Sequence, residues 1–284
     1  MREIIKSARD ELHDLEIFVR IAAPALLQAT KRKDQIDLHN RILETLGEAS
    51  APPTARQMEL IEAEEKFATE QSAQGIPYLY DLAVVRLWGT LAACIDDVVA
   101  AALQNPESCK DNKLLARLKG PLISFRSASP VEQAEYLAET LRRELNASLK
   151  VGVGRFEDIL DPIGMAGAVD EVIRKLLLEL SQVRNVVVHK RGRVDKRYLE
   201  SCPWSSQNIG DQVATNAESF DLYYHAAHWY LNTLISRLWV REGKDSSKAD
   251  SFLQELSAYI SKGFEKRNNV LRGPSGEQAQ VPDS

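Results

Sequence analysis

Apolar residues recur at helical spacing along almost the whole chain, and no convincing run alternates as a half-buried strand would. The most regular stripe includes Val169, Leu176, Leu180 and Val187, which fall on one face of a helix. A nearly continuous apolar run at about 79–103 predicts a second helix, buried in the core. The pattern therefore predicts an all-α protein built as a helical bundle.

Prolines, glycines and capping residues divide this pattern into elements. Ser129 followed by Pro130 and Glu132 is typical of a helix start, and Thr215 with Glu218 has the spacing of a second capping box. The glycine-rich stretch 152–167 lacks the lysine of a phosphate-binding loop and is interpreted as a long connection. We predict helices at 2–48 (one broken helix or two), 56–72, 79–104, 113–118, 129–149, 169–189, 215–242 and 247–263.

A provisional domain boundary falls at the Gly75-Ile76-Pro77 turn. Residues 1–75 are expected to form an additional N-terminal helical segment with a regulatory or dimerisation role, and 76–243 the main helical domain. A C-terminal helix is expected at 244–264. The tail at 265–284 has few apolar residues and is predicted to be disordered.

Composition restricts the possible partners and the compartment. With 36 basic and 41 acidic residues, the net charge of −5 gives no overall attraction to nucleic acid, so any RNA contact must be local. The three cysteines have no disulfide or zinc spacing, and the N-terminus lacks an apolar signal stretch, so a cytoplasmic location is expected. Arg86, Asp96 and Asp97 interrupt the apolar run, which argues against a membrane span. No metal and no cofactor are expected.

The segment Arg184-Asn185-Val186-Val187-Val188-His189 closes the most regular predicted helix. Histidine titrates near neutrality and suits proton transfer, whereas a guanidinium offers planar, permanently charged donors for a phosphate. Asn185 precedes His189 by four residues and shares its face. Arg184 and His189 lie about 140° apart on an ideal helix, so one copy need not complete a site. The simpler interpretation is two cations at a helix C-terminus, which the helix dipole favours.

This segment and the basic run after it resemble the ribonuclease motif of the HEPN superfamily, over residues 184–198. The resemblance implies a HEPN-type bundle and a metal-independent endoribonuclease that uses 2′-hydroxyl attack, with Arg184, His189 and Asn185 as catalytic residues. It also implies a homodimer, a toxin or antiviral-defence setting, and a neutralising antitoxin or regulatory protein as partner. RNA is expected to contact Lys190, Arg191, Arg193, Lys196, Arg197 and Tyr198.

Alternatives stay open. The same pattern would fit a non-catalytic helical module that binds RNA, nucleotide or protein. It would also fit a purely structural adaptor bundle that does not bind RNA. Arg32 and His39 match the loosest motif spacing without its context, and we interpret them as coincidence. His225 and His228 are expected to pack among aromatic residues rather than bind metal, and Asp96 with Asp97 to serve a helix face.

Overall fold

The computed structural model describes residues 1–48, 53–104, 122–145, 151–213 and 215–272, and every regular element in these ranges is a helix. The predicted all-α class is therefore confirmed. The elements are α1 (Arg2–Ala29), α2 (Arg32–Thr45), α3 (Ala55–Ala73), α4 (Pro77–Leu103), α5 (Leu122–Ser127), α6 (Pro130–Leu145), α7 (Val153–Leu160), the 3₁₀ helix η3 (Asp161–Ile163), α8 (Glu171–Lys190), α9 (Lys196–Ser201), α10 (Ala217–Arg241) and α11 (Ser247–Arg272).

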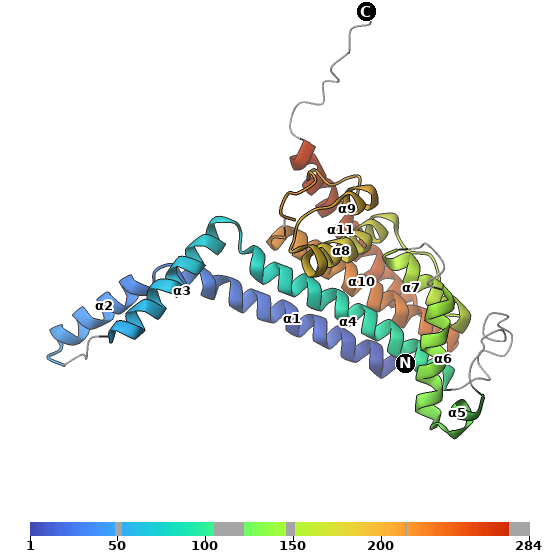
Figure 1. Ribbon diagram of the computed structural model, residues 1–284. Coiled ribbons are helices and arrows are strands. Elements are labelled where there is room, and N and C mark those ends of the chain that lie inside the picture. The colour runs from blue at the N-terminus through green and yellow to red at the C-terminus, as the bar shows by residue number, and fades with distance from the viewer. Residues whose placement is uncertain (49–52, 105–121, 146–150, 214, 273–284) are drawn as a thin grey trace, which may run out of the picture.

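Helices α4 and α10 lie at the centre of the bundle, as Figure 1 shows. Helices α1, α6 and α8 pack against α4, while α1, α8 and α11 pack against α10. Leu87, Leu91 and Ile95 of α4 are completely buried, and so are Leu231 and Leu234 of α10. Their nearly uniform apolar character is what a helix surrounded by others requires. Within the described ranges, none of the helices has the length and apolarity needed to cross a membrane.

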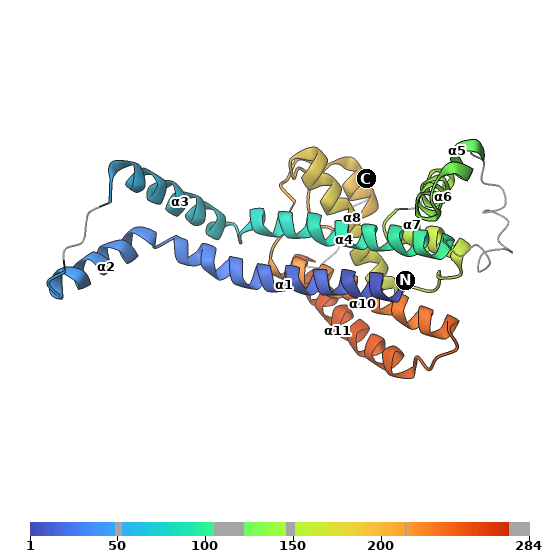
Figure 2. The same cartoon turned by 90° about the horizontal axis from the view of Figure 1, so that it is seen from below.

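The provisional boundary at residue 75 coincides with the turn between α3 and α4, where Gly75 and Ile76 both adopt positive φ. It does not separate two cores, because α1 runs along α4 and α10 and buries Ile5, Leu12 and Val19 in the same apolar cluster. Of this N-terminal segment, α2 and α3 extend beyond the bundle as an arm, which Figure 2 shows from below. The N-terminal segment is thus partly core and partly projection.

The arm formed by α2 and α3 is mostly solvent-exposed. Among its described residues α2 buries none, and α3 buries only Ala68. Large apolar side chains are exposed to solvent at Leu38 and Ile42 of α2, at Leu46 directly after α2, and at Phe67 of α3. The arm is therefore held to the molecule by the packing of α3 against α1 and α2 rather than by a core of its own.

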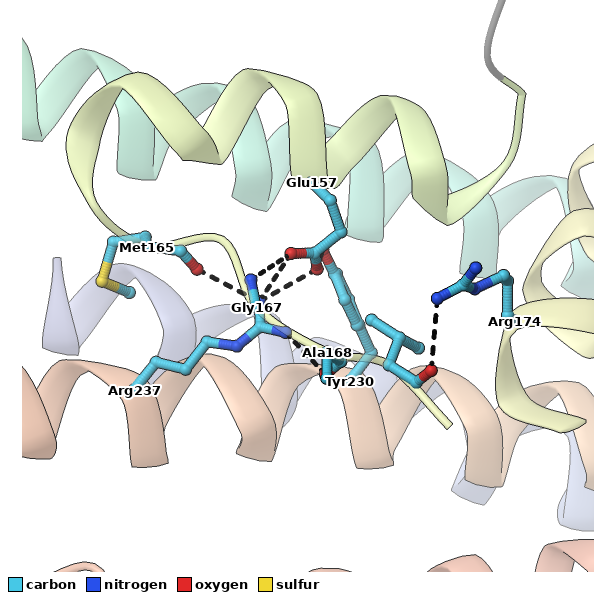
Figure 3. Close-up of polar contacts among 8 residues, drawn as sticks. Glu157, Met165, Gly167, Ala168, Arg174, Tyr230 and Arg237 are labelled. Atoms are coloured by element: carbon cyan, nitrogen blue, oxygen red, sulfur yellow. Dashed lines mark hydrogen bonds and ion pairs between the residues drawn. The ribbon is translucent and has the colours of Figure 1, made fainter. Parts of the chain in front are cut away.

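The stretch 152–167 is more structured than predicted, because it contains α7 and η3. One ion pair and several hydrogen bonds fasten it to α10, as Figure 3 shows. Arg237 Nη1 lies 2.9 Å from Glu157 Oε1 and donates to the Met165 carbonyl at 3.1 Å. Glu157 also accepts from the Tyr230 hydroxyl at 2.7 Å and from the Gly167 amide at 2.7 Å. Helix α7 also buries four apolar residues, whose spacing among the glycines was too short to indicate a helix.

The predicted capping residue is the observed one for α6 but not for α10. Ser129 and Glu132 exchange the reciprocal capping bonds predicted for α6, at 2.7 and 3.3 Å. The cap of α10 is shifted by one residue, since Asn216 rather than Thr215 accepts from the amide of Ser219. Thr215 is occupied elsewhere, because its hydroxyl donates to Asp81 of α4.

The C-terminal helix is longer than predicted. Helix α11 continues through Arg272, so residues 265–272, which were assigned to a disordered tail, are helical. The apolar residue Phe264 and the cation Arg267 are both buried near this end, and their packing on the bundle extends the helix. The short helix predicted at 113–118, the predicted end at Leu149 and the tail 273–284 lie outside the described residues.

Candidate functional site at the end of α8

Helix α8 carries the candidate motif on its last two turns. It begins at the Asp170 cap, whose carboxylate accepts from the amides of Val172 and Ile173. It ends at Lys190, after which Arg191 and Gly192 adopt positive φ and the Gly192 amide donates to the Val186 carbonyl at 3.1 Å. This left-handed termination is a common helix C-cap and turns the chain away directly behind His189.

The three predicted catalytic side chains gather within one chain. Arg184 Nη1 donates to Asn185 Oδ1 at 3.2 Å and to His189 Nε2 at 3.4 Å. The long arginine side chain therefore spans the angle that separates positions 184 and 189 on the helix. Because a guanidinium can only donate, Nε2 is the acceptor in this contact, and the neutral imidazole carries its proton on Nδ1.

A groove of about 370 Å³ lies beside this cluster. Asn185 and His189 line it together with Gln182, which precedes them by three and seven residues and so lies on the same face of α8. Sequence reasoning missed Gln182, although this i, i+3, i+7 spacing was readable in the chain. The other lining residues are Val186, Lys190, Asp195 and Arg197.

The basic residues after α8 differ in how free they are. All of the predicted cations are exposed, but Arg193 Nη1 donates to the Gly210 carbonyl at 3.0 Å and Lys196 lies 3.6 Å from Glu200. Lys190 lies 4.0 Å from Asp195, a contact in solvent that is worth little. Of the predicted RNA-contacting cations, Lys190 and Arg197 line the groove itself.

The loop between α8 and α9 is fixed by backbone pairing with a later segment. The Val194 amide donates to the Asp211 carbonyl at 2.9 Å, and the Val213 amide to the Gly192 carbonyl at 2.7 Å. Arg193 and Gln212 form an antiparallel bridge between these bonds. The basic run is therefore held in one place beside His189 and is more than a solvated loop.

Tyr198 does not join the exposed basic surface. Its side chain is only 2% exposed, so it cannot offer a ring face to an RNA base in this structure. The cause is the cap of α9: Asp195 accepts from the Tyr198 amide at 2.9 Å and starts a helix whose third residue points inward. Burial, with the charge of Glu179 added, raises the pKa of the Tyr198 phenol well above its usual value. Tyr198 is therefore removed from the residues expected to contact RNA.

A buried polar network lies on α8 five residues before Arg184. Glu179 Oε2 accepts from Arg267 Nη2 and from Trp204 Nε1, each at 2.8 Å, while Oε1 accepts from the Tyr223 hydroxyl at 2.8 Å. Glu179 and Arg267 are 6% and 9% exposed. The network joins α8 to α10, to α11 and to the segment after α9, and so fixes the helix that presents the motif.

The two histidines of α10 lie among aromatic rings, as predicted. The His228 ring stacks on Tyr224 with centroids 6.0 Å apart, and His225 lies 5.0 Å from the Tyr259 ring. Asp96 of α4 forms an ion pair with Arg142 of α6 at 2.5 Å, which makes it a helix-packing residue. In the part of the chain that the structure describes, no three His, Cys, Asp or Glu side chains gather closely enough to hold a metal ion.

The two described cysteines are poor nucleophile candidates. Cys94 and Cys202 are free and buried. Burial, with smaller contributions from the charges of Asp97 and Glu11, raises the pKa of the Cys94 thiol to about 12. A thiol attacks in its ionised form, so the Cys94 thiol is a poor nucleophile at neutral pH.

His189, Lys190 and Arg197 thus line the groove together with the carboxylate of Asp195, and the Arg184 guanidinium contacts His189 beside it. An imidazole can accept and donate a proton, and a guanidinium offers paired donors to a phosphate. Comparison of the chain with protein-family models, with curated proteins and with solved structures finds no match.

Proposed function

We propose that this protein is a metal-independent endoribonuclease of HEPN type. The observation that supports this most is the contact of 3.4 Å between Arg184 Nη1 and His189 Nε2 beside a groove lined by Lys190 and Arg197. Proton transfer and charge stabilisation, the two requirements of phosphodiester cleavage, have a candidate group each at this surface.

In the proposed reaction the Arg184 guanidinium turns from His189 Nε2 to the phosphate of the bound RNA. The freed Nε2 of the neutral imidazole then removes the proton of a ribose 2′-hydroxyl. The 2′-oxygen forms a bond to the adjacent phosphorus, and the bond from phosphorus to the 5′-oxygen of the next nucleotide breaks. The imidazolium returns its proton to that leaving oxygen, so the products are a 2′,3′-cyclic phosphate and a 5′-hydroxyl. Arg184 stabilises the charge that gathers on the phosphorane, and Asn185 orients the guanidinium.

The same resemblance extends the proposal to the biological setting. We place the enzyme in the cytoplasm, as a homodimer whose two motifs share one cleft, in a toxin or antiviral-defence role. A neutralising antitoxin or regulatory protein is the proposed partner. Closed two-fold pairing is the commonest arrangement of soluble homo-oligomers.

The test is cleavage of a single-stranded RNA in EDTA by the wild type, by Arg184→Ala and by His189→Ala. Each substitution is expected to lower the rate at least ~100-fold, the usual size of an acid–base or electrostatic contribution. Lys175→Ala is the matched control, because Lys175 pairs with Glu171 near the start of α8, outside the groove. An inert wild type, or three equal rates, would exclude the enzyme.

The second candidate is a non-catalytic module that binds RNA through the same surface. Its support is the Arg184–His189 hydrogen bond itself, which can also be a purely structural contact. Such a module would bind RNA with an affinity that falls as salt rises, would lose affinity in Arg197→Ala, and would leave the RNA intact. A bundle that only binds proteins would show neither property.

A further inference from the structure

A second groove, of about 440 Å³, lies where the first turns of α1 meet the end of α10 and the start of α11. Figure 2 shows the start of α1 and the turn between α10 and α11 at this same end of the bundle. Four cations line it: Arg2, Lys6 and Arg9 from α1, and Lys248 from α11. Glu3 is the single carboxylate among the lining residues. We call this the α1–α11 groove.

The cations of the α1–α11 groove are arranged at some cost to α1. Arg2, Lys6 and Arg9 are spaced i, i+4 and i+7 and therefore share one helix face, where like charges repel. Within the described part of the chain none of the four forms an ion pair, although Arg9 Nη1 donates to Asn232 Oδ1 at 3.4 Å. Glu242 is near enough for Arg2 to help lower its pKa, but its main partner is Lys244. The groove therefore keeps an excess of positive charge.

Part of the lining of this groove is apolar and aromatic. Trp239 and Ile235 of α10 and Phe252 of α11 line it, and the Phe252 side chain is 43% exposed. Aromatic faces of this kind stack on planar heterocycles, and such stacking contributes ~1–3 kcal/mol per base. The volume falls within the roughly 300–1,000 Å³ typical of small-molecule sites.

We propose that the α1–α11 groove binds a nucleoside di- or triphosphate. Its cations would hold the phosphates and its aromatic residues the base. Four cations against one carboxylate leave an excess of three positive charges, which suits a polyphosphate better than a single phosphate.

This site is separate from the motif on α8. Tyr223, which bonds Glu179 of α8, lies sixteen residues before Trp239 on α10, or about 24 Å along the helix axis. The nucleotide site therefore stands independently of the proposed ribonuclease.

The test is calorimetric titration of the full chain with ATP, ADP, adenosine and inorganic triphosphate, and then with GTP, CTP and UTP. ATP or another nucleoside triphosphate is expected to bind at least ~10-fold more tightly than adenosine or inorganic triphosphate, because the base and the phosphates each supply part of the contact. Lys6→Glu and Trp239→Leu should each weaken binding by ~10-fold or more. Arg20→Glu is the matched control, since Arg20 is an exposed cation of α1 outside the groove.

Far-ultraviolet circular dichroism and melting temperature are to be compared among the variants, so that a folding defect is separated from a binding defect. Absence of nucleotide binding at millimolar concentration overturns the proposal, as does equal affinity for inorganic triphosphate and ATP. Binding that Lys6→Glu and Trp239→Leu leave unchanged overturns it too. If a 12-nucleotide single-stranded RNA binds and loses affinity in Lys6→Glu while nucleotides do not bind, the groove is an RNA surface and the proposal fails.

Discussion

His225 and His228 lie one turn apart on α10, yet their surroundings shift their pKa values in opposite directions. Burial, followed by the charges of Arg9 and His225, lowers the pKa of His228 to about 4. Burial also acts to lower the pKa of His225, but its contacts with the Asp221 carboxylate and carbonyl outweigh burial and raise it. The two histidines are therefore expected to have opposite effects on stability in acid.

Acid should destabilise this protein through His228. Between pH 6.5 and about 4 the unfolded chain binds a proton at this position and the folded chain does not, so stability is full above pH 6.5 and falls as the pH drops. A pKa unit corresponds to about 1.4 kcal/mol, and solvent screening of this partly exposed ring reduces the total effect to about 1–2 kcal/mol. In His228→Gln the free energy of unfolding should therefore fall less between pH 7 and pH 4.5 than in the wild type. Urea unfolding at the two pH values measures this difference.

His225→Gln is the opposite control. The raised pKa of His225 contributes stability that is fully present below its unfolded pKa and is lost as the pH rises through the folded value. Its replacement should therefore lower the urea midpoint at pH 4.5 more than at pH 8. Identical pH dependence in both variants would contradict this assignment.

At the scale of the element, the chain's pattern predicted those helices whose apolar face is long and regular. Helices α8 and α10 repeat their apolar positions over five turns or more, and a repeat of that length outweighs local noise. Helix α7 has eight residues among glycines and a proline, so its four buried residues do not stand out as a period. Tyr198 was misplaced for the same reason, because six residues of α9 after a loop cannot be phased from spacing alone.

Arg267→Met should destabilise the protein by about 3–5 kcal/mol, the usual cost of leaving one partner of a buried ion pair alone. The substitution removes the cation that lies 2.8 Å from Glu179 while keeping most of the side-chain volume. The Glu179 carboxylate then stays buried with only the neutral donors of Trp204 and Tyr223. Chemical denaturation measures the lost free energy of unfolding. The ion pair that the substitution removes joins α11 to α8.

The double variant Arg267→Met/Glu179→Gln separates charge from packing. It buries no charge, so most of the lost stability should return, since replacing both partners of a buried pair is often close to neutral. Equal destabilisation in the single and double variants would show that the volume and hydrogen bonds of Arg267, rather than its charge, hold α11 in place.

At the scale of the whole molecule, the order in which helices pack could not be predicted from the pattern. Periodicity shows which face of a helix is buried but does not show which other helix covers it. For this reason the turn at Gly75 looked like a domain boundary, although α1 and α4 share a core across it. The exposed apolar residues of α2 likewise follow from the path of the chain, which carries α2 beyond the bundle.

The contact between Arg184 and His189 within one chain makes a prediction for the proposed dimer. Mixed dimers of Arg184→Ala and His189→Ala subunits, purified through two different tags, contain no chain that keeps both residues. They should cleave RNA no faster than either mutant homodimer, because the 3.4 Å contact joins residues of the same chain. Mixed dimers of wild type with the double variant are the control and should keep about half of the activity, as one of two symmetric motifs is intact. Recovery of about half the activity in the first mixture would instead show that each site takes its arginine from one chain and its histidine from the other.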